Sequence, residues 1–412
     1  MLFSPLTLPN GSTLPNRLAK AAMEEGMAEL GQLPGPAIHR LYARWAEGGT
    51  GLLITGNVMV DSRALTGAGT VALEAGTPLA SFKAWADACH QHGAKIWMQI
   101  NHPGRQTMAN MGGLAWGPSA VALDLGKHSK LFVQPVAMTH DQIAEVIQRF
   151  ADTAYAAEQA GFDGVQIHGA HGYLLSQFLS PLTNLRDDEW GGSLINRARL
   201  LLDIVRAVRA RVSAGFCVAV KLNSADFQRG GFSEADARQV VMLLNDLPVD
   251  LIELSGGSYE SPAMQGRTAD GRTLAREAYF LEFAQALAVV ARIPVMTTGG
   301  IARQAVAEQV LASGVAVVGM ATALTVAPDL PRQWRAGNAP AATSRPVHWK
   351  DKILASLATM AVARRRLRHL GADGGGGSSG GNLSPLFSLV VDQLLVSLLT
   401  RRYRKWRTQS AS

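Results

Sequence analysis

Residues 164–178 read GVQIHGAHGYLLSQF, an apolar run that ends in two histidines and a tyrosine. The first six residues have the continuous apolar character of a strand buried on both faces of a parallel sheet. Residues 140–161, directly before it, have the apolar spacing of an amphipathic helix. Thr139 or His140 can begin that helix, and Gly161 is where a C-terminal cap is expected. A helix followed at once by a buried strand indicates a parallel α/β fold.

The same alternation extends in both directions along the chain. Eight apolar runs predict strands, at 17–23, 51–60, 95–100, 164–169, 217–223, 251–257, 293–300 and 315–321. Amphipathic helical patterns lie between them, for example at 36–49, 80–93, 140–161, 233–247 and 302–314. Eight strands in strict alternation with helices predict a (β/α)8 TIM barrel. A doubly wound sheet is the alternative, but no G-x-G-x-x-G pattern follows the first strand.

Two further features belong to the barrel interpretation. The segment LTL-PNG-STL, with Asn10-Gly11 at its turn, predicts a small hairpin that plugs the N-terminal mouth of the barrel. The segments 101–138 and 170–200 are too long for plain connections. Because insertions at the C-terminal ends of barrel strands usually build the site, we expect both segments to lie around it.

Composition favours a reduced, cytoplasmic protein. The chain has only two cysteines, Cys89 and Cys217, and no CxxC motif, which argues against an iron–sulfur cluster or a structural zinc site. One disulfide is compatible with the count, but a core this large needs no such link. The first residues lack the pattern of a signal peptide, and no run has the length of a membrane span.

The positive charge is concentrated in the tail. Residues 346–412 hold eleven Lys and Arg against three Asp, whereas residues 1–345 hold 28 basic and 29 acidic residues. We therefore expect no nucleic-acid partner. The division predicts a barrel domain over 1–345 and a helical extension over 346–412, with a Gly/Ser-rich linker at 373–381. The last helix has a cationic end; it packs on the barrel or a neighbouring subunit, or it contacts a membrane surface.

The densest group of reactive side chains is His168, His171 and Tyr173, at the end of the fourth strand. Polar rings at the C-terminal end of a barrel strand face the pocket of such folds. Two imidazoles can together hold one oxygen and stabilise charge that develops on it. A tyrosine hydroxyl is protonated at neutral pH and can act as a general acid. The alternatives are ordinary loop residues or a metal pair, although no third ligand of matching character stands nearby.

The wider sequence resembles the old yellow enzyme family of NADH:flavin oxidoreductases over nearly all of residues 1–340. The resemblance rests on HGAHGYLLSQFLSPLTN and DEWGGSLINRARL, and on LFSPLTLPNGSTLPNRLAKAAM, YARWAEGGTGLLITG, MQINHPGRQ, LSGGSYESP, TTGGI and VVGMATAL. It implies an FMN cofactor, NADH or NADPH as reductant, and hydride transfer from flavin N5 to an activated alkene. His168 and His171 would bind the carbonyl or nitro oxygen, and Tyr173 would protonate the α-carbon.

The resemblance also implies a cofactor site. The residues expected to contact FMN are Ala22, Met23, Glu24, Gly56, Gln99, Lys221, Gly299, Gly300, Gly319 and Met320. Gln99 would meet the pyrimidine edge, and Lys221 would lie near flavin N1 and O2, where a cation stabilises the reduced form. The glycines of TTGG and VVGM let the backbone approach a phosphate closely.

Three residues depart from the family pattern. Glu24 stands where a small polar residue is usual; a carboxylate there would disfavour the reduced flavin anion, unless burial holds it neutral. Met320 replaces a phosphate-binding Arg, and Lys221 replaces an Arg and loses its bidentate fork. We interpret all three as variation within the family.

Other residues and functions are kept open. Trp116, Met138 and Tyr259 could line the pocket but suit plain packing better, and His102 suits a structural role. The expected substrate is an electrophilic alkene, and a homo-oligomer is compatible with the sequence. The alternatives are a different FMN barrel dehydrogenase that works in the oxidative direction, or a flavin-binding, membrane-associated protein.

Overall fold

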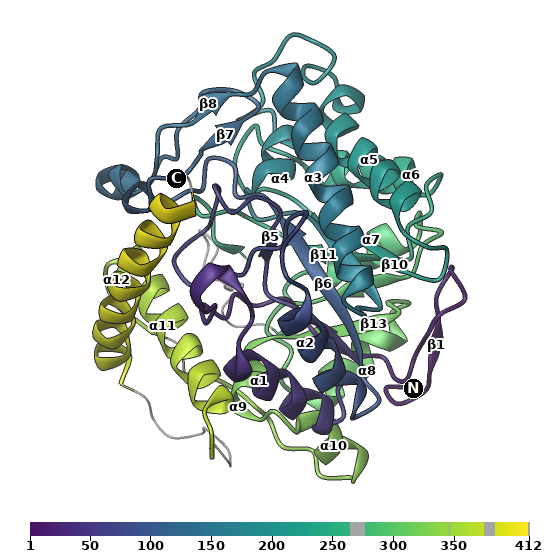
Figure 1. Ribbon diagram of the computed structural model, residues 1–412. Coiled ribbons are helices and arrows are strands. Elements are labelled where there is room, and N and C mark those ends of the chain that lie inside the picture. The colour runs from purple at the N-terminus through teal and green to yellow at the C-terminus, as the bar shows by residue number, and fades with distance from the viewer. Residues whose placement is uncertain (264–276, 346, 375–383, 411–412) are drawn as a thin grey trace.

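The computed structural model describes residues 1–263, 277–345, 347–374 and 384–410 (Figure 1). Eight parallel strands form a closed barrel, because β4 pairs with both β3 and β6 while the other strands follow one another around the ring. The eight-stranded prediction is confirmed, and the doubly wound alternative is wrong. The barrel strands are β3 (Leu18–Lys20), β4 (Leu52–Ile54), β6 (Lys95–Asn101), β9 (Gly164–Gly169), β10 (Cys217–Asn223), β11 (Leu251–Ser255), β12 (Val295–Thr297) and β13 (Val317–Met320).

Helices surround the barrel, and five of them match the helical patterns of the sequence. These are α1 (Pro36–Glu47), α2 (Ala80–His90), α3 (His140–Gln159), α6 (Glu234–Leu244) and α8 (Gln304–Ala312). Thr139 caps α3 in a capping box with Gln142, and Gly161 follows its end at φ +82°, as expected of a C-terminal cap. The sequence patterns did not identify α5 (Leu194–Arg211), α7 (Leu281–Ala288), α9 (Thr322–Val326) or α10 (Leu330–Arg335).

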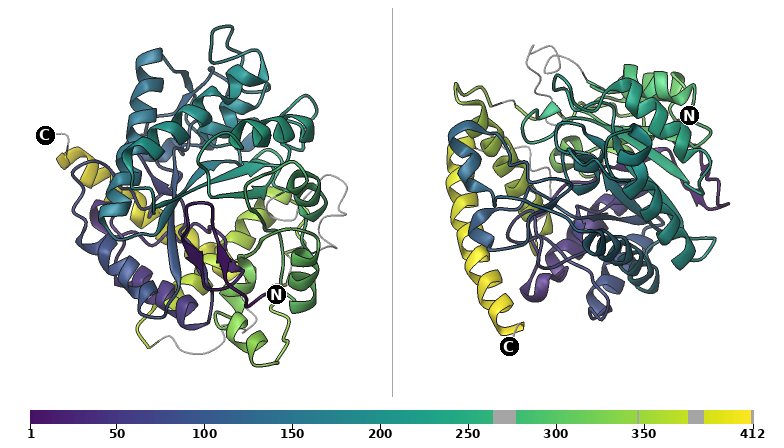
Figure 2. Two further views of the ribbon diagram at one scale, coloured as in Figure 1. Left: turned by 90° about the vertical axis from the view of Figure 1, so that its right-hand side faces the viewer. Right: turned by 90° about the horizontal axis from the view of Figure 1, so that it is seen from above.

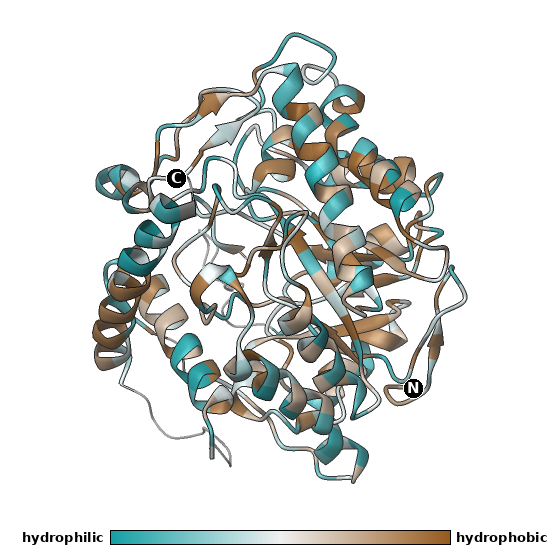
Figure 3. Ribbon diagram, in the orientation of Figure 1, coloured by the Kyte–Doolittle hydropathy of each residue, from teal (hydrophilic) through white to brown (hydrophobic). Residues whose placement is uncertain are grey.

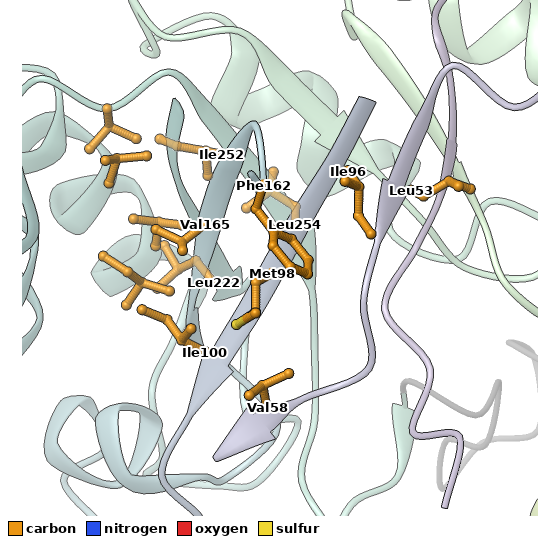
Figure 4. Packing of buried hydrophobic residues seen from close by; sticks show 14 of the residues in the cluster. Leu53, Val58, Ile96, Met98, Ile100, Phe162, Val165, Leu222, Ile252 and Leu254 are labelled. Atoms are coloured by element: carbon orange, nitrogen blue, oxygen red, sulfur yellow. The ribbon is translucent and has the colours of Figure 1, made fainter. Parts of the chain in front are cut away.

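Alternation along the strands divides the apolar side chains into two layers. Outward-facing residues such as Ile96, Met98 and Val165 pack under the helices (Figure 4). Inward-facing residues such as Trp97 and Met296 fill the lower barrel interior. Leu8 and Leu14 of the N-terminal hairpin join this inner layer, so burial of their side chains holds the hairpin in place.

The hairpin consists of β1 (Leu6–Thr7) and β2 (Thr13–Leu14), which pair antiparallel as predicted. It lies across the barrel in the left view of Figure 2, and the predicted plug at the N-terminal mouth is confirmed. The run 51–60 is shorter than predicted as a barrel strand: after β4 the chain turns and resumes as β5 (Val58–Met59), which extends the edge of β6.

The two long insertions contain short elements of their own. The first carries β7 (Trp116–Gly117) and β8 (Val136–Ala137), which pair with each other, and the second carries α4 (Leu174–Leu179). Both insertions follow barrel strands at their C-terminal ends, which puts them at the mouth opposite the hairpin.

The C-terminal extension packs on the barrel domain. Helix α11 (Lys352–Gly371) lies against α1 and α9, and α12 (Pro385–Ser410) lies against α11. Tyr403 of α12 is buried and donates a hydrogen bond from its hydroxyl to the carbonyl of Ser62, at 2.7 Å. The right view of Figure 2 shows α12 along the side of the molecule that is opposite the N-terminus. Most of the predicted linker 373–381 lies outside the described residues.

Candidate active site

A row of four polar side chains crosses the barrel interior below the C-terminal mouth. Gln99 Nε2 donates to Gln166 Oε1 at 2.7 Å, and Gln166 Nε2 donates to Glu253 Oε2 at 2.8 Å. Lys221 Nζ donates to Glu253 Oε1 at 2.8 Å. The four side chains are buried, and Gln166 and Glu253 stand on strands that are not neighbours, so their bond spans the interior. The row gives the barrel a polar floor with one balanced ion pair.

Three rings converge above this floor. The ring centroids of His168 and His171 are 5.0 Å apart, and those of His168 and Tyr173 are 4.9 Å apart, each pair at an interplanar angle of 79°. His168 ends β9, and the short turn before α4 returns the next two rings toward it. The expectation that these three side chains gather at one place is therefore met.

Local hydrogen bonds orient the two imidazoles. The N–H of Ala170 donates to His168 Nδ1 at 3.3 Å, so the ring proton of a neutral His168 is on Nε2. His171 Nε2 lies 2.7 Å from Ser255 Oγ, and the backbone N–H of His171 donates to Asn223 Oδ1 at 3.1 Å. If the Ser255 hydroxyl donates to Nε2, the His171 proton is on Nδ1. Each ring then offers one N–H.

His171 has an unusual backbone conformation. Its φ is +62°, in the left-handed region, where a residue with a side chain is under strain. Such strain persists only where surrounding contacts impose it, and it is often found at functional sites. His171 is held by hydrogen bonds to Asn223 and Ser255 and by the Gln106 side chain, whose Nε2 donates to the His171 carbonyl at 3.1 Å.

Tyr173 has a second tyrosine as its neighbour. The hydroxyl oxygens of Tyr173 and Tyr259 are 3.1 Å apart, and their ring centroids are 6.0 Å apart. Phe132, from the first insertion, packs at 6.0 Å from the Tyr259 ring. Tyr259 thus belongs to the site and is more than a packing residue, contrary to the preferred interpretation of the sequence.

Burial sets the protonation states of the rings. Burial, reinforced by the positive charge of Lys221, lowers the pKa of His168 and of His171 well below the usual value of 6.5. Burial also raises the pKa of Tyr173 well above 10, with the Tyr259 hydroxyl and the Glu24 charge adding to the effect. At neutral pH the site therefore presents two neutral imidazoles and one protonated phenol.

The end of β3 lies at the same mouth. Ala22, Met23 and Glu24 are partly exposed where the strand leaves the barrel. Glu24 Oε1 accepts hydrogen bonds from the hydroxyls of Thr66 and Thr70, and Glu24 Oε2 lies 3.0 Å from Arg364 Nη2. Glu24 is not fully buried, and a cation and two hydroxyls satisfy its carboxylate.

Gly56, which is also expected to contact the cofactor, lies against the chain that leaves β3. Its N–H donates to Glu25 Oε1 at 3.0 Å, and its carbonyl accepts from the Thr55 hydroxyl at 2.7 Å. A Cβ at this position would lie 2.3 Å from the Met23 carbonyl oxygen. Glycine is needed here because the two strand ends pass so close together.

The glycine turn after β12 is open on one side. Gly299 and Gly300 have φ values of +123° and +73°; a Cβ on Gly300 would lie 2.4 Å from the Tyr279 hydroxyl oxygen, and one on Gly299 would make a tight contact of 3.1 Å with the Tyr279 backbone. Among the described residues, neither glycine N–H has a hydrogen-bond acceptor. Gly319 instead allows Met296 to pack beside it, and the Met320 side chain is buried under the helices. Only the backbone of Met320 could therefore face a ligand.

These residues fit FMN. Among the residues that the structure describes, buried side chains at the strand ends have polar atoms without a hydrogen-bond partner, namely Asn101 Oδ1 and Nδ2 and Asn57 Oδ1. Such atoms are costly unless a ligand satisfies them. Gln99 and Lys221 would hold the ring system, and the glycine turn after β12 has N–H groups of the kind that bind phosphate, which make no hydrogen bond within the described residues.

Several residues of the site were missed by sequence reasoning. Gln166 and Glu253 lie inside runs that were interpreted only as strands. A charged residue in an apolar run indicates a buried, paired side chain, so Glu253 could have been found. Ser255 was also missed, and no local pattern identifies Arg364. His102 is buried with its ring 6.1 Å from Trp116, and burial lowers its pKa to about 4, which suits the structural role expected of it.

Within the described ranges, one group of three side chains could hold a metal ion, namely His140, Asp188 and Glu189. It lies in exposed and half-buried positions and does not include His168 or His171. Both cysteines are buried and unpaired. Within the described residues, no helix combines the length and the apolar character that crossing a bilayer requires.

Comparisons with known proteins identify the family of the chain. The family model of the NADH:flavin oxidoreductase / NADH oxidase family matches residues 1–339. The NADH-dependent flavin oxidoreductase iliE of Hypocrea jecorina is 38% identical over 352 residues, which is 80% of this chain and 87% of that protein. The protein of the same name from a Neonectria species is 39% identical over 353 residues, but the match covers 80% of this chain and only 46% of that longer protein.

A solved structure also matches the barrel. The old yellow enzyme homologue from Zymomonas mobilis superimposes with a TM-score of 0.72 and 27% sequence identity, over 84% of this chain and 94% of that chain. The chain belongs to the NADH:flavin oxidoreductase / NADH oxidase family, and it is an FMN-dependent oxidoreductase of the old yellow enzyme type that takes NAD(P)H as its reductant.

Proposed function

We propose that this oxidoreductase reduces activated C=C bonds, such as those of enones, enals, maleimides and nitroalkenes. The observation that carries the proposal is the convergence of three rings at the barrel mouth. The centroid of the His168 ring lies 5.0 Å from that of His171 and 4.9 Å from that of Tyr173. When bound, FMN that has been reduced by NAD(P)H supplies the hydride. The protein supplies the proton and the oxygen clamp, which is the pair of N–H groups of His168 and His171 that binds the substrate oxygen.

The clamp follows from the tautomers of the two histidines. His168 Nε2–H and His171 Nδ1–H donate hydrogen bonds to the carbonyl or nitro oxygen of the substrate. As the alkene accepts a hydride at its β-carbon, negative charge develops on that oxygen, and both hydrogen bonds strengthen. Because the imidazoles are neutral and already oriented, they need no reorganisation at that moment.

Tyr173 delivers the proton. Its raised pKa keeps the hydroxyl protonated, and the α-carbon of the clamped substrate takes that proton as the charge collapses from the oxygen. The Tyr259 hydroxyl, 3.1 Å away, fixes the direction of the Tyr173 hydroxyl and can hand a proton back to it.

A dehydrogenase that works in the oxidative direction is the second candidate. It would use the same cofactor contacts but would need a base near the carbon that loses a proton. The raised pKa of Tyr173 keeps its hydroxyl protonated, so it does not accept a proton at neutral pH. The Ala170 N–H occupies the acceptor nitrogen of His168, and in this proposal the Ser255 hydroxyl occupies that of His171, so neither ring is available as a base. The ring cluster therefore favours the reductive direction.

The test separates the two half-reactions of the Tyr173→Phe variant under anaerobic stopped flow. We expect oxidation of NADPH or NADH to be within about twofold of wild type, while reduction of 2-cyclohexenone slows by about 10²–10⁴-fold, the usual contribution of a general acid. An equal loss in both half-reactions, or an unchanged rate with cyclohexenone, would contradict the proton-donor role.

The outer face of α12 supports an accessory role. Leu386, Val390, Leu394 and Leu398 form an exposed row with i, i+4 spacing, and they are 50–63% exposed. Four exposed cations, Arg401, Arg402, Arg404 and Lys405, follow on the same helix. Figure 3 shows the same division, with a hydrophobic first half and a hydrophilic last half of α12.

We propose that this face makes weak contact with an anionic membrane surface on the cytoplasmic side. Apolar side chains beside an excess of cations match the chemistry of an acidic lipid interface. Vesicles of phosphatidylcholine should bind the protein only when phosphatidylserine is added, and the Leu394→Glu variant should lose binding with turnover unchanged. A concentration-dependent dimer that the same substitution dissociates, without vesicle binding, would replace the lipid by a second copy of the chain.

A further inference from the structure

The C-terminal extension brings a cation to the rim of the candidate active site. Arg364 stands near the middle of α11, and its Nη2 lies 3.0 Å from Glu24 Oε2, although the two residues are 340 positions apart. Their side chains are only 22% and 25% exposed. Glu24 directly follows Ala22 and Met23, which are expected to contact FMN, so the pair stands at the edge of the predicted cofactor site.

Arg364 is itself held by α12. Its Nη1 lies 3.2 Å from Asp392 Oδ2, and Arg368 Nη2 lies 2.7 Å from Asp392 Oδ1. The Asp392 side chain is only 3% exposed. Two carboxylates and two guanidinium groups thus alternate in a row that has no net charge. The row begins with Glu24 at the rim of the barrel and links helices α11 and α12. Because none of the four side chains is more than 25% exposed, this row differs from a loose surface ion pair.

The same pair reaches the phenols electrostatically. The Glu24 charge contributes to raising the pKa of Tyr173 and of Tyr259, after the larger effect of burial, and Arg364 acts in the opposite direction on both. Glu24 without Arg364 would be a lone negative charge beside the place where the cofactor gains negative charge on reduction. Such a charge would disfavour the reduced form.

We propose that Arg364 is a positioning residue of the active site, which holds the Glu24 carboxylate and balances its charge so that reduction of bound FMN is not opposed. This inference rests on the proposed function, and it makes the C-terminal extension part of the redox site. It also explains how a carboxylate can stand where relatives of the family carry a small polar residue.

The experiment compares the midpoint potential of bound FMN in the full-length protein and four variants, by anaerobic titration against a reference dye. The variants are Arg364→Met, Glu24→Gln, the double variant Glu24→Gln/Arg364→Met, and Arg368→Met. Arg368→Met is the matched control, because it removes a guanidinium that pairs with Asp392 but does not reach Glu24. FMN retention on gel filtration and the melting temperature are recorded for each protein.

We expect Arg364→Met to weaken binding of reduced FMN about tenfold relative to oxidised FMN, which lowers the potential by about 30 mV for a two-electron couple. Glu24→Gln should raise the potential, and the double variant should return close to wild type. Arg368→Met should leave the potential unchanged even if the melting temperature falls. Arg364→Lys should restore most of the loss, because it keeps the charge.

Two results would overturn the inference in different ways. If wild type and all variants hold FMN at one common potential while the melting temperatures differ, Arg364 is only a structural link between α11 and the barrel. If wild-type protein cannot take up FMN, the proposed function fails first and this inference fails with it. Should Arg364→Met not fold, Glu24→Gln alone decides, since an unchanged potential in that variant contradicts the charge balance.

Discussion

The hydroxyl oxygen of Tyr259 lies 3.1 Å from that of Tyr173, and this makes Tyr259 the nearest support of the proposed proton donor. Removing the Tyr259 hydroxyl should cost about one hydrogen bond, near 1 kcal/mol, which corresponds to about fivefold in rate. We expect Tyr259→Phe to slow enone reduction by that factor, far less than Tyr173→Phe. Rapid-mixing kinetics on both variants measures the ratio. A larger loss in Tyr259→Phe would make Tyr259 the donor instead.

Ser255 should matter for binding of the substrate oxygen, because its hydroxyl lies 2.7 Å from His171 Nε2, and by donating to that nitrogen it would keep the ring proton on Nδ1. We expect Ser255→Ala to weaken binding of a phenol ligand about fivefold. The control is Ser193→Ala, which removes the N-cap of α5 and should cost about 1 kcal/mol of stability without changing phenol affinity. Equal affinity in Ser255→Ala and wild type would mean that the Ser255 hydroxyl does not orient the His171 ring.

Glu253 should be essential for the folded barrel, because it balances Lys221 where both side chains are at most 3% exposed. Removing one partner of a buried pair typically costs about 3–5 kcal/mol. We expect Glu253→Gln to lower the free energy of unfolding by about that amount in urea titrations. The double variant Glu253→Gln/Lys221→Met should lose less, because no unbalanced charge is left inside. If the double variant loses the sum of both single effects, the two residues are not coupled.

Stability should fall as the pH drops below neutral. Burial lowers the pKa of His102 to about 4 and the pKa values of His168 and His171 well below 6.5. In the unfolded chain these histidines take up a proton near pH 6.5, whereas in the folded protein they stay neutral to a lower pH. Between about pH 6.5 and 4 the unfolded state binds more protons, and each such histidine lowers the free energy of unfolding by up to about 1.4 kcal/mol per pH unit.

Comparison of wild type with His102→Asn isolates one of these protons. The variant should show a smaller slope of unfolding free energy against pH in that window, by about one proton, and the same stability trend above pH 7. Identical slopes in the two proteins would show that His102 is protonated in the folded state.

The barrel could be predicted from the sequence because a buried parallel strand carries its signal within itself. The run 164–169 and its seven counterparts are predominantly apolar, and helices with a clear apolar face lie between them. The sequence patterns did not identify helices α5 and α7. Helix α5 begins inside the motif whose polar residues indicate an active site, and α7 is too short for a clear helical pattern.

The three rings could be placed together because they are neighbours in sequence at one strand end. The contacts that support them could not. Ser255 reaches His171 from β11, and Tyr259 reaches Tyr173 from the segment that follows β11. Arg364 reaches Glu24 across 340 residues. Such contacts depend on how the barrel closes and where the extension packs, which no local pattern encodes.

The most direct test of the oxygen clamp is a titration of the FMN-loaded protein with p-chlorophenol, followed by visible absorbance. We expect a yellow protein that gains a long-wavelength band as the phenol binds, and a His168→Ala/His171→Ala variant that remains yellow but gains no band. A double variant that binds the phenol as tightly as wild type, or a yellow wild type that shows no band at saturating phenol, would contradict the account.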